Sequence, residues 1–136
     1  MKRRSARLAM VCAAAALLAA AGIAVLTAQA PSVKRTVLLK QDATVPGKEV
    51  VMAAVEIPPG GAEGKHTHPA EVYVFVREGE IELFAQGQPT RTVKAGEVFT
   101  IAPGQVHEGT NKGKETARLL AVFFADKGKP LTTQAQ

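Results

Sequence analysis

The chain has 136 residues, enough for one domain with short extensions, and a formal net charge of +5. Four of its 17 basic side chains and no acidic ones lie in residues 1–30, so residues 31–136 carry 13 basic and 12 acidic side chains. This balanced charge excludes binding of a nucleic-acid phosphate backbone as the function of the main body. The single cysteine, Cys12, lies in the N-terminal segment, which excludes disulfides and cysteine chemistry from residues 31–136.

Residues 1–30 have the three-part layout of a secretory signal peptide. Lys2, Arg3, Arg4 and Arg7 precede 19 uncharged, mostly apolar residues (8–26), and the segment ends in an Ala-Gln-Ala pattern at 28–30. The alternative is an uncleaved membrane anchor, because 19 residues can just span a bilayer. In either case the basic end stays in the cytoplasm and the body is expected outside, in the periplasm or secreted. Contact with a membrane is expected only through an uncleaved leader.

The body reads as an all-β domain. Short β-branched runs alternate with Gly and Pro, and a helical period is absent. The pattern predicts strands at 36–41, 49–57, 72–77, 80–85, 90–94, 98–101 and 117–124, with turns between them. Glycines 79, 96 and 104 are expected to accept positive φ in such turns. A sandwich or a barrel-like jelly roll is therefore expected over residues 31–126, followed by a loose polar tail at 127–136.

The three histidines of the chain carry the expected chemistry. His66 and His68 are two residues apart, so on a strand they share one face and can chelate a divalent metal. His107 follows a Pro-Gly turn at 103–104, and a strand after that turn could bring it back across a barrel. Neutral imidazole is the metal-binding form, so metal affinity is expected to fall as the pH drops through roughly 6.5. The alternative is a polar surface pair and a loop histidine.

Two segments of the chain resemble the paired motifs of the cupin superfamily. The first runs from Gly60 through His66-Thr67-His68 and Glu71 to Gly79, and the second, 16 residues later, has Gly96, Pro103-Gly104, His107 and Asn111. The resemblance covers most of residues 34–126. It implies a double-stranded β-helix with a metal inside a small barrel, and His66, His68 and His107 as ligands.

The chain departs from the cupin pattern at two positions. The second motif has Ala102 where a proline is usual. In the first, the carboxylate ligand usually stands seven residues before the closing glycine, which places Val72 there and not Glu71. A slip of one residue on a strand reverses the face, so Glu71 is a ligand only if a bulge near 69–70 turns it inward. A three-histidine site is the alternative.

The resemblance leaves two main functions open, with sugar-type isomerisation, which needs a positioned base, as a third. The first is a metal-dependent, dioxygenase-type enzyme acting on a small molecule, with Fe, Mn, Zn, Ni or Cu as the metal. The second is a non-catalytic module that binds a small ligand or a metal. Apart from Glu71, no acid–base residue stands out. Tyr73 and Phe75 have the parity of Glu71, and as outward-facing aromatics they would suit the interface of a homodimer. The alternative is that they pack under the N-terminal strands.

Overall fold

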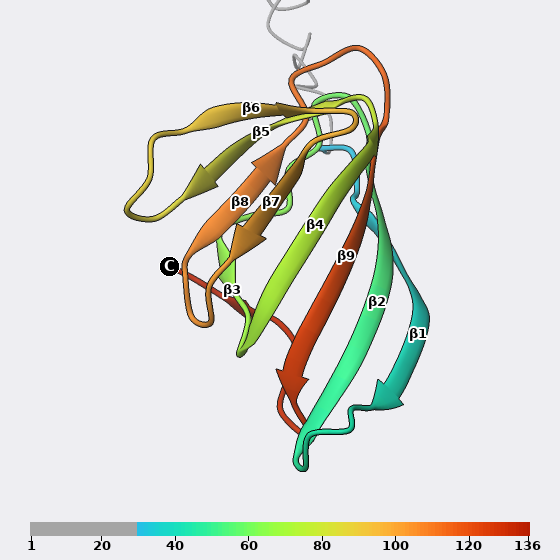
Figure 1. Cartoon of the computed structure of the whole chain (residues 1–136). Helices are drawn as coiled ribbons and strands as arrows, with labels where there is room; N and C mark the ends of the chain where they lie inside the picture. Colours follow the sequence, from blue (N-terminus) through green and yellow to red (C-terminus); the bar gives the residue numbers. More distant parts are fainter. Residues whose placement is uncertain (1–29) are drawn as a thin grey trace, which may run out of the picture.

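The computed structural model describes residues 30–136, which form ten β-strands. Figure 1 shows the long strands on one side of the molecule and the shorter strands on the other. In chain order the strands are β1 (Lys34–Asp42), β2 (Lys48–Ile57), β3 (His66–Thr67), β4 (Ala70–Glu78), β5 (Glu80–Ala85), β6 (Arg91–Lys94), β7 (Val98–Ile101), β8 (His107–Thr110), β9 (Ala117–Asp126) and β10 (Thr133–Gln134).

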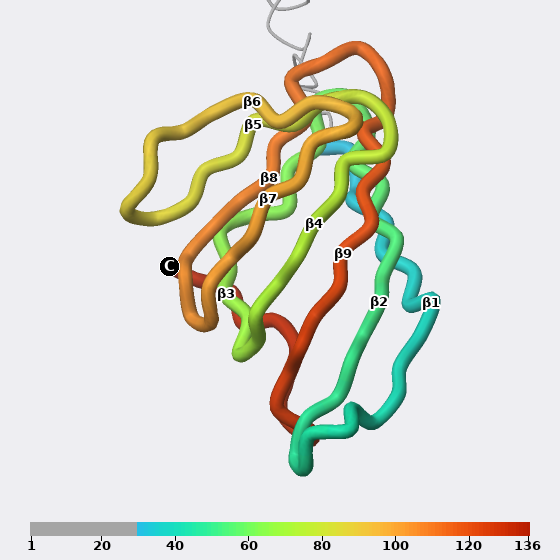
Figure 2. The backbone as a smooth tube through the Cα atoms, in the orientation of Figure 1, coloured from blue at the N-terminus to red at the C-terminus, as the bar shows by residue number. Residues whose placement is uncertain are grey.

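The strands form two five-stranded antiparallel sheets. One has the order β1-β2-β9-β4-β7 and the other the order β10-β3-β8-β5-β6. The path of the chain in Figure 2 crosses between the sheets several times, so neighbours within a sheet are mostly distant in sequence. The expected all-β fold is confirmed, and each strand predicted from the sequence is present.

The core lies between the two sheets, where the alternating side chains of their inner faces meet. In β2, β4 and β9, buried residues alternate with exposed or half-buried ones along almost the whole strand, as expected for sheets with one covered face. Val74, Val76, Leu83 and Ile101 are among the buried residues of this core. The core side chains are mainly small aliphatic ones, which leaves space inside the barrel.

Tight turns occur at the three glycines where they were expected. Gly79, Gly96 and Gly104 have φ values of 72°, 89° and 74°, a region that favours glycine. At Gly79 a Cβ would also come within 3.0 Å of the Ala117 backbone. This position therefore combines a left-handed turn with close approach of two strands.

The C-terminal residues differ from the expected loose tail. Thr133 and Gln134 pair with Thr67 and His66 as a short edge strand, and Leu131 packs against the core. Residues 127–136 are mostly polar, and the expectation of a loose tail rested on that average composition. The single apolar contact of Leu131 with the core fixes the tail instead.

The N-terminal leader, whether a signal peptide or an anchor, lies outside the described residues. Among residues 30–136 there is no helix of the length and hydrophobicity that a membrane crossing requires.

Candidate metal centre

The two histidine segments meet where β3 and β8 pair. His66 begins β3 and His107 begins β8, and these two residues face each other directly in the antiparallel register. His68 follows two residues after His66, on the same side of the extended chain. The carbonyl oxygen of His68 accepts a hydrogen bond of 2.8 Å from the backbone N–H of Gly104, which ties the first histidine segment to the turn before His107.

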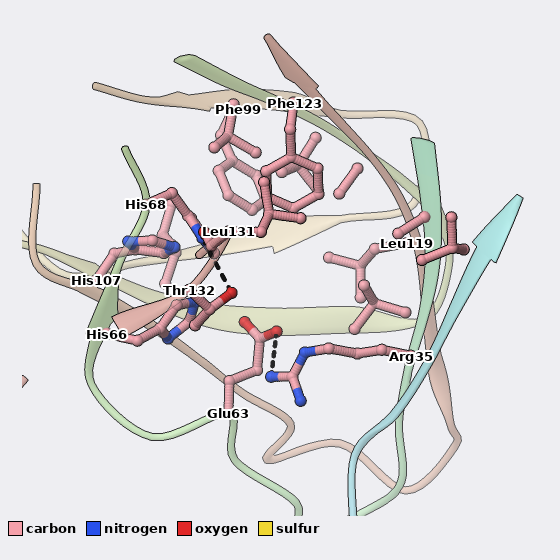
Figure 3. Close-up of a pocket in the computed structure, with 17 residues that line it drawn as sticks. Arg35, Glu63, His66, His68, Phe99, His107, Leu119, Phe123, Leu131 and Thr132 are labelled. Atoms are coloured by element: carbon pink, nitrogen blue, oxygen red, sulfur yellow. Dashed lines mark hydrogen bonds and ion pairs between the residues drawn. The ribbon is translucent and has the colours of Figure 1, made fainter. Parts of the chain in front are cut away.

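The three imidazoles form one buried cluster. One ring nitrogen of each histidine lies within 4.8 Å of those of the other two. Their ring centroids are 4.2–4.9 Å apart. The ring of His68 also packs edge-on against Phe123, 5.0 Å away between centroids. Figure 3 shows the rings gathered at one end of the cavity, with the aromatic side chains on one side of it.

Each imidazole is fixed in the same tautomer by a backbone carbonyl. The Nδ1 atoms of His66, His68 and His107 bond to the carbonyl oxygens of Gly64 (2.7 Å), Leu131 (2.7 Å) and Gln105 (3.0 Å). A carbonyl oxygen only accepts, so each Nδ1 carries the proton and each Nε2 keeps a free lone pair. Carbonyl partners of this kind orient the histidine ligands of metal sites. The cluster therefore offers three neutral nitrogen donors, which fits a divalent transition metal.

Burial keeps two of these rings neutral. Desolvation lowers the pKa of His68 to about 4, and the nearby His107, His66 and Arg35 act in the same direction. Desolvation also lowers the pKa of His107 to about 4. For these two rings, competition between protons and a metal is therefore expected below the pH of about 6.5 that an unperturbed histidine gives, because burial lowers their pKa.

Without metal, the protein is expected to lose stability as the pH falls from about 6.5 to about 4. In this window the unfolded chain protonates His68 and His107 while the folded chain does not, so protons favour unfolding. Each unit of pKa depression corresponds to about 1.4 kcal/mol. Thermal melts in chelator, from pH 7.5 to pH 4, measure this loss. The His68→Gln/His107→Gln chain, which lacks both groups, should show a flatter profile. An equal slope in the two proteins would contradict the assignment.

Glu71, one of the expected ligands, lies outside the cluster. Its side chain is exposed, and it accepts a hydrogen bond of 2.8 Å from the hydroxyl of Tyr73. This bond raises the pKa of Tyr73. The bulge needed to turn Glu71 inward is absent near 69–70, because β4 pairs with β9 in register from Ala70 to Val76. The register therefore places Glu71 on the outer face, away from the three histidines, and not among the metal ligands. Val72 occupies the inward position.

Replacing Glu71 by alanine is expected to change little. Since the side chain is exposed and on the outer face, stability should stay within about 0.5 kcal/mol of wild type and metal affinity within about twofold. Val72→Glu should instead raise metal affinity, because residue 72 lines the cavity that holds the histidines. Calorimetric titration of both variants with the same metal measures this. A loss of affinity in Glu71→Ala comparable to that in a histidine variant would contradict the register argument.

The cluster closes one end of a cavity of about 120 Å³. Side chains from β2, β4, β5, β7 and β9 make most of its wall apolar, including Val55, Val74, Phe99 and Phe123. A small molecule held there would contact the imidazoles at one end and hydrocarbon at the other.

An ion pair that the sequence did not reveal completes the polar side of the cavity. Arg35 at the start of β1 and Glu63 in the loop before β3 both line it, and their charged groups are 3.1 Å apart. Figure 3 shows the pair beside His66. The backbone N–H of Glu63 donates a hydrogen bond to the carbonyl of Gly109. Position 109 has no side chain, and a Cβ there would lie only 2.9 Å from the Glu63 carboxylate. Only the folded structure brings residues 28 positions apart into this pair.

A small antiparallel barrel with three inward-facing histidines defines the class of this protein. The chain belongs to the cupin family: residues 53–123 match the family described as Cupin domain.

Sequence relatives place the chain near germin-like proteins. It is 42% identical over 79 residues to germin-like protein subfamily 2 member 2 of Arabidopsis thaliana, covering 54% of this chain and 36% of that protein. Germin-like protein 1-1 of Oryza sativa subsp. japonica is also 42% identical over 79 residues, 54% of this chain and 37% of that protein. The chain thus spans little more than a third of the length of these curated relatives.

Solved structures share the fold. A Klebsiella pneumoniae protein with a double-stranded β-helix domain has 25% identity and a TM-score of 0.65, covering 78% of this chain and 89% of that one. A recombinant oxalate oxidase in complex with glycolate has 26% identity and a TM-score of 0.61, covering 78% of this chain and 59% of that one.

Proposed function

We propose that this protein is an exported metallo-cupin whose His66, His68 and His107 hold one divalent transition metal, and that it is a dioxygenase-type enzyme acting on a small anionic molecule. The observation that carries the proposal is the cluster of three buried imidazoles, each fixed with Nε2 free, at the polar end of an apolar cavity. The oxalate oxidase structures to which the chain is similar support the part on a small anionic substrate.

The donor set restricts the metal only to a group. Imidazole suits Fe, Mn, Zn, Ni and Cu. His66, His68 and His107 would hold the metal as neutral ligands, so a bound metal would supply Lewis acidity to an anionic ligand and, if redox-active, electron transfer. Position 72 is a valine and not a carboxylate, so no ligand charge would offset the charge of the metal.

The protein's own residues supply recognition and proton transfer. Arg35 offers a planar fork that matches a carboxylate, and its present partner Glu63 can receive a proton once a substrate carboxylate replaces it on Arg35. The apolar wall excludes water from the other side of the ligand. Glycolate, the ligand named with one similar oxalate oxidase, is a small carboxylic acid of the kind that Arg35 would bind.

Oxygen consumption with a panel of small acids tests the enzyme proposal. The full chain, reconstituted with each candidate metal, is mixed with hydroxy-, oxo- and dicarboxylic acids, and with phenols, diketones and thiols. Turnover is expected with one class of small carboxylic acid. Glu63→Gln should reduce it by roughly 10²-fold or more at unchanged metal content, the usual contribution of a general acid–base group. Glu56→Gln removes a carboxylate from an exposed pair with Lys34 and is the matched control.

A non-catalytic module is the alternative within the same site. The exposure of Arg35 favours it, because half of that side chain is open to solvent and could bind an anion without closing a reaction chamber. Saturable binding of a carboxylic acid with no oxygen uptake across the panel would replace the enzyme proposal by this one.

Export and self-association are two further parts of the proposal. The basic residues, the apolar run and the Ala-Gln-Ala pattern of residues 1–30 support export, with a membrane anchor as the alternative. A leader–reporter fusion whose reporter stays in the cytoplasm would contradict both the signal peptide and the anchor.

The exposed Tyr73 (47%), Phe75 (41%) and Val98 (60%) on the outer face of β4 and β7 support a homodimer. Sedimentation of wild type and Phe75→Glu tests it, and a monomeric wild type at micromolar concentration would overturn it.

A further inference from the structure

The last residues of the chain lie directly against the histidine cluster. Residues 131–135, here named the C-terminal strap, run beside β3, and Figure 1 shows the C-terminus next to that strand. Leu131 and Thr132 line the same cavity as the three histidines, and Figure 3 shows both beside His68. The strap is thus part of the wall of the candidate metal site.

The three histidines differ in what orients them. The Nδ1 partners of His66 and His107 are carbonyls only two residues away, so each ring is fixed by its own turn. The Nδ1 partner of His68 is the carbonyl of Leu131, 63 residues away. The hydroxyl of Thr132 lies 3.3 Å from the same nitrogen. The orientation of His68 therefore depends on whether the strap is docked.

Few bonds hold the strap in place. It pairs with β3 over two residues, and the backbone N–H of Ala135 donates to the carbonyl of Lys65 at 3.0 Å. Leu131 supplies the apolar anchor against the core, while Thr132, Thr133 and Gln134 are exposed. A short edge strand with only two half-buried residues, Leu131 and Ala135, is a segment of low local stability, so its docking can vary without unfolding the barrel.

We propose that the C-terminal strap is a positioning element of the metal site. Docked, it holds His68 with Nδ1 protonated and Nε2 directed at the cluster; released, it leaves His68 free to rotate and to exchange its proton between the two nitrogens. The strap thereby sets the affinity of the site and the exposure of its cavity to ligands. The inference rests on the proposed metal-binding function, because the consequence of losing the His68 orientation is expressed in metal binding.

Nitrogen NMR of the histidine rings tests the orientation without any metal. Spectra of the full chain at pH 7.5 in chelator should show all three rings with Nδ1 protonated. A chain ending at Pro130 should show a mixture of both neutral tautomers at His68 alone, with His66 and His107 unchanged. Removal of Gln136 alone is the matched control and should leave all three rings as in the full chain. A folded chain ending at Pro130 in which His68 stays entirely Nδ1-protonated would overturn the proposal.

A second variant keeps the test decisive if the shortened chain does not fold. Ala135→Pro removes the N–H that bonds to Lys65 while keeping Leu131 in the chain. It should shift His68 toward the tautomer mixture in the same direction, by a smaller fraction. An unchanged His68 spectrum in this variant would count against the strap.

Metal titration of the same proteins measures the functional consequence. Removal of a partner that orients a metal-ligating histidine usually lowers metal affinity 10- to 100-fold, and Co²⁺ is a suitable probe because its visible spectrum reports the ligand geometry. The chain ending at Pro130 should bind Co²⁺ about 10- to 100-fold more weakly, with an altered spectrum. Equal affinity and an identical spectrum would overturn the proposal. If the full chain binds no metal, the proposed function fails, while the metal-free ring spectra still decide whether the strap orients His68.

Discussion

Replacing His107 by alanine is expected to abolish the rise in melting temperature that a divalent transition metal gives the wild-type protein. A ligand that binds only the folded state stabilises it by about 2.7 kcal/mol at 100 times its dissociation constant, which corresponds to roughly 10 °C or more in a domain of this size. His107 faces His66 directly across β3 and β8. Its loss leaves only two of the three clustered imidazoles.

The control for this variant separates metal binding from folding. His107 is buried, so the variant should also melt lower without metal, and the quantity compared is therefore the metal-induced increment within each protein. Gln105→Ala removes side-chain bonds to Gln86 and Ala102 but keeps the carbonyl that bonds to His107. It should melt lower and retain the full increment. An undiminished increment in His107→Ala would show that the metal binds elsewhere.

Asn111→Asp is expected to destabilise the fold by about 3–5 kcal/mol, the usual cost of an uncompensated buried charge. The Asn111 side chain is almost fully buried. Its amide donates to the carbonyls of Ile57 (2.7 Å) and Glu115 (2.8 Å), and its carbonyl accepts from the backbone N–H of Gly113 (2.9 Å). Aspartate keeps only the acceptor, so two buried carbonyls lose their donor beside a buried charge.

Urea denaturation of the metal-free protein measures this effect. Lys112→Ala is the matched control, because Lys112 is the next residue and makes an exposed ion pair with Glu82. It should cost no more than about 1 kcal/mol. If Asn111→Asp unfolds within about 1 kcal/mol of wild type, the amide does not hold the loop after β8 to the end of β2.

Apolar runs separated by Gly and Pro made the all-β fold predictable, and the spacing of the histidines made the cluster predictable. Residues 49–57 and 117–124 are mostly apolar, and they form β2 and β9, which pair with each other. The parity of Glu71 and Val72 likewise favoured a three-histidine site, as the register of β4 shows. Strands β3, β8 and β10 were not among the predicted strands, because their sequences (His-Thr, His-Glu-Gly-Thr and Thr-Gln) contain no apolar residue that would mark a strand.

Long-range contacts explain the rest of what the sequence did not reveal. Arg35 and Glu63 are ordinary surface residues in sequence and become cavity-lining partners only when β1 lies beside the loop before β3. The Leu131 carbonyl has no sequence signature at all, because any residue supplies a backbone oxygen. Motif spacing thus identified the three histidines, whereas the groups that orient and surround them follow from tertiary packing.

Metal stoichiometry with ligand identity tests the central claim most directly. The full chain is purified, saturated with one redox-silent metal such as Zn²⁺, dialysed, and measured by elemental analysis and X-ray absorption. One metal per chain is expected, with three imidazole nitrogens in its coordination shell, and one imidazole fewer in each of His66→Ala, His68→Ala and His107→Ala. A wild-type chain that retains no transition metal, or one whose bound metal keeps the same shell in all three variants, would contradict the three-histidine centre.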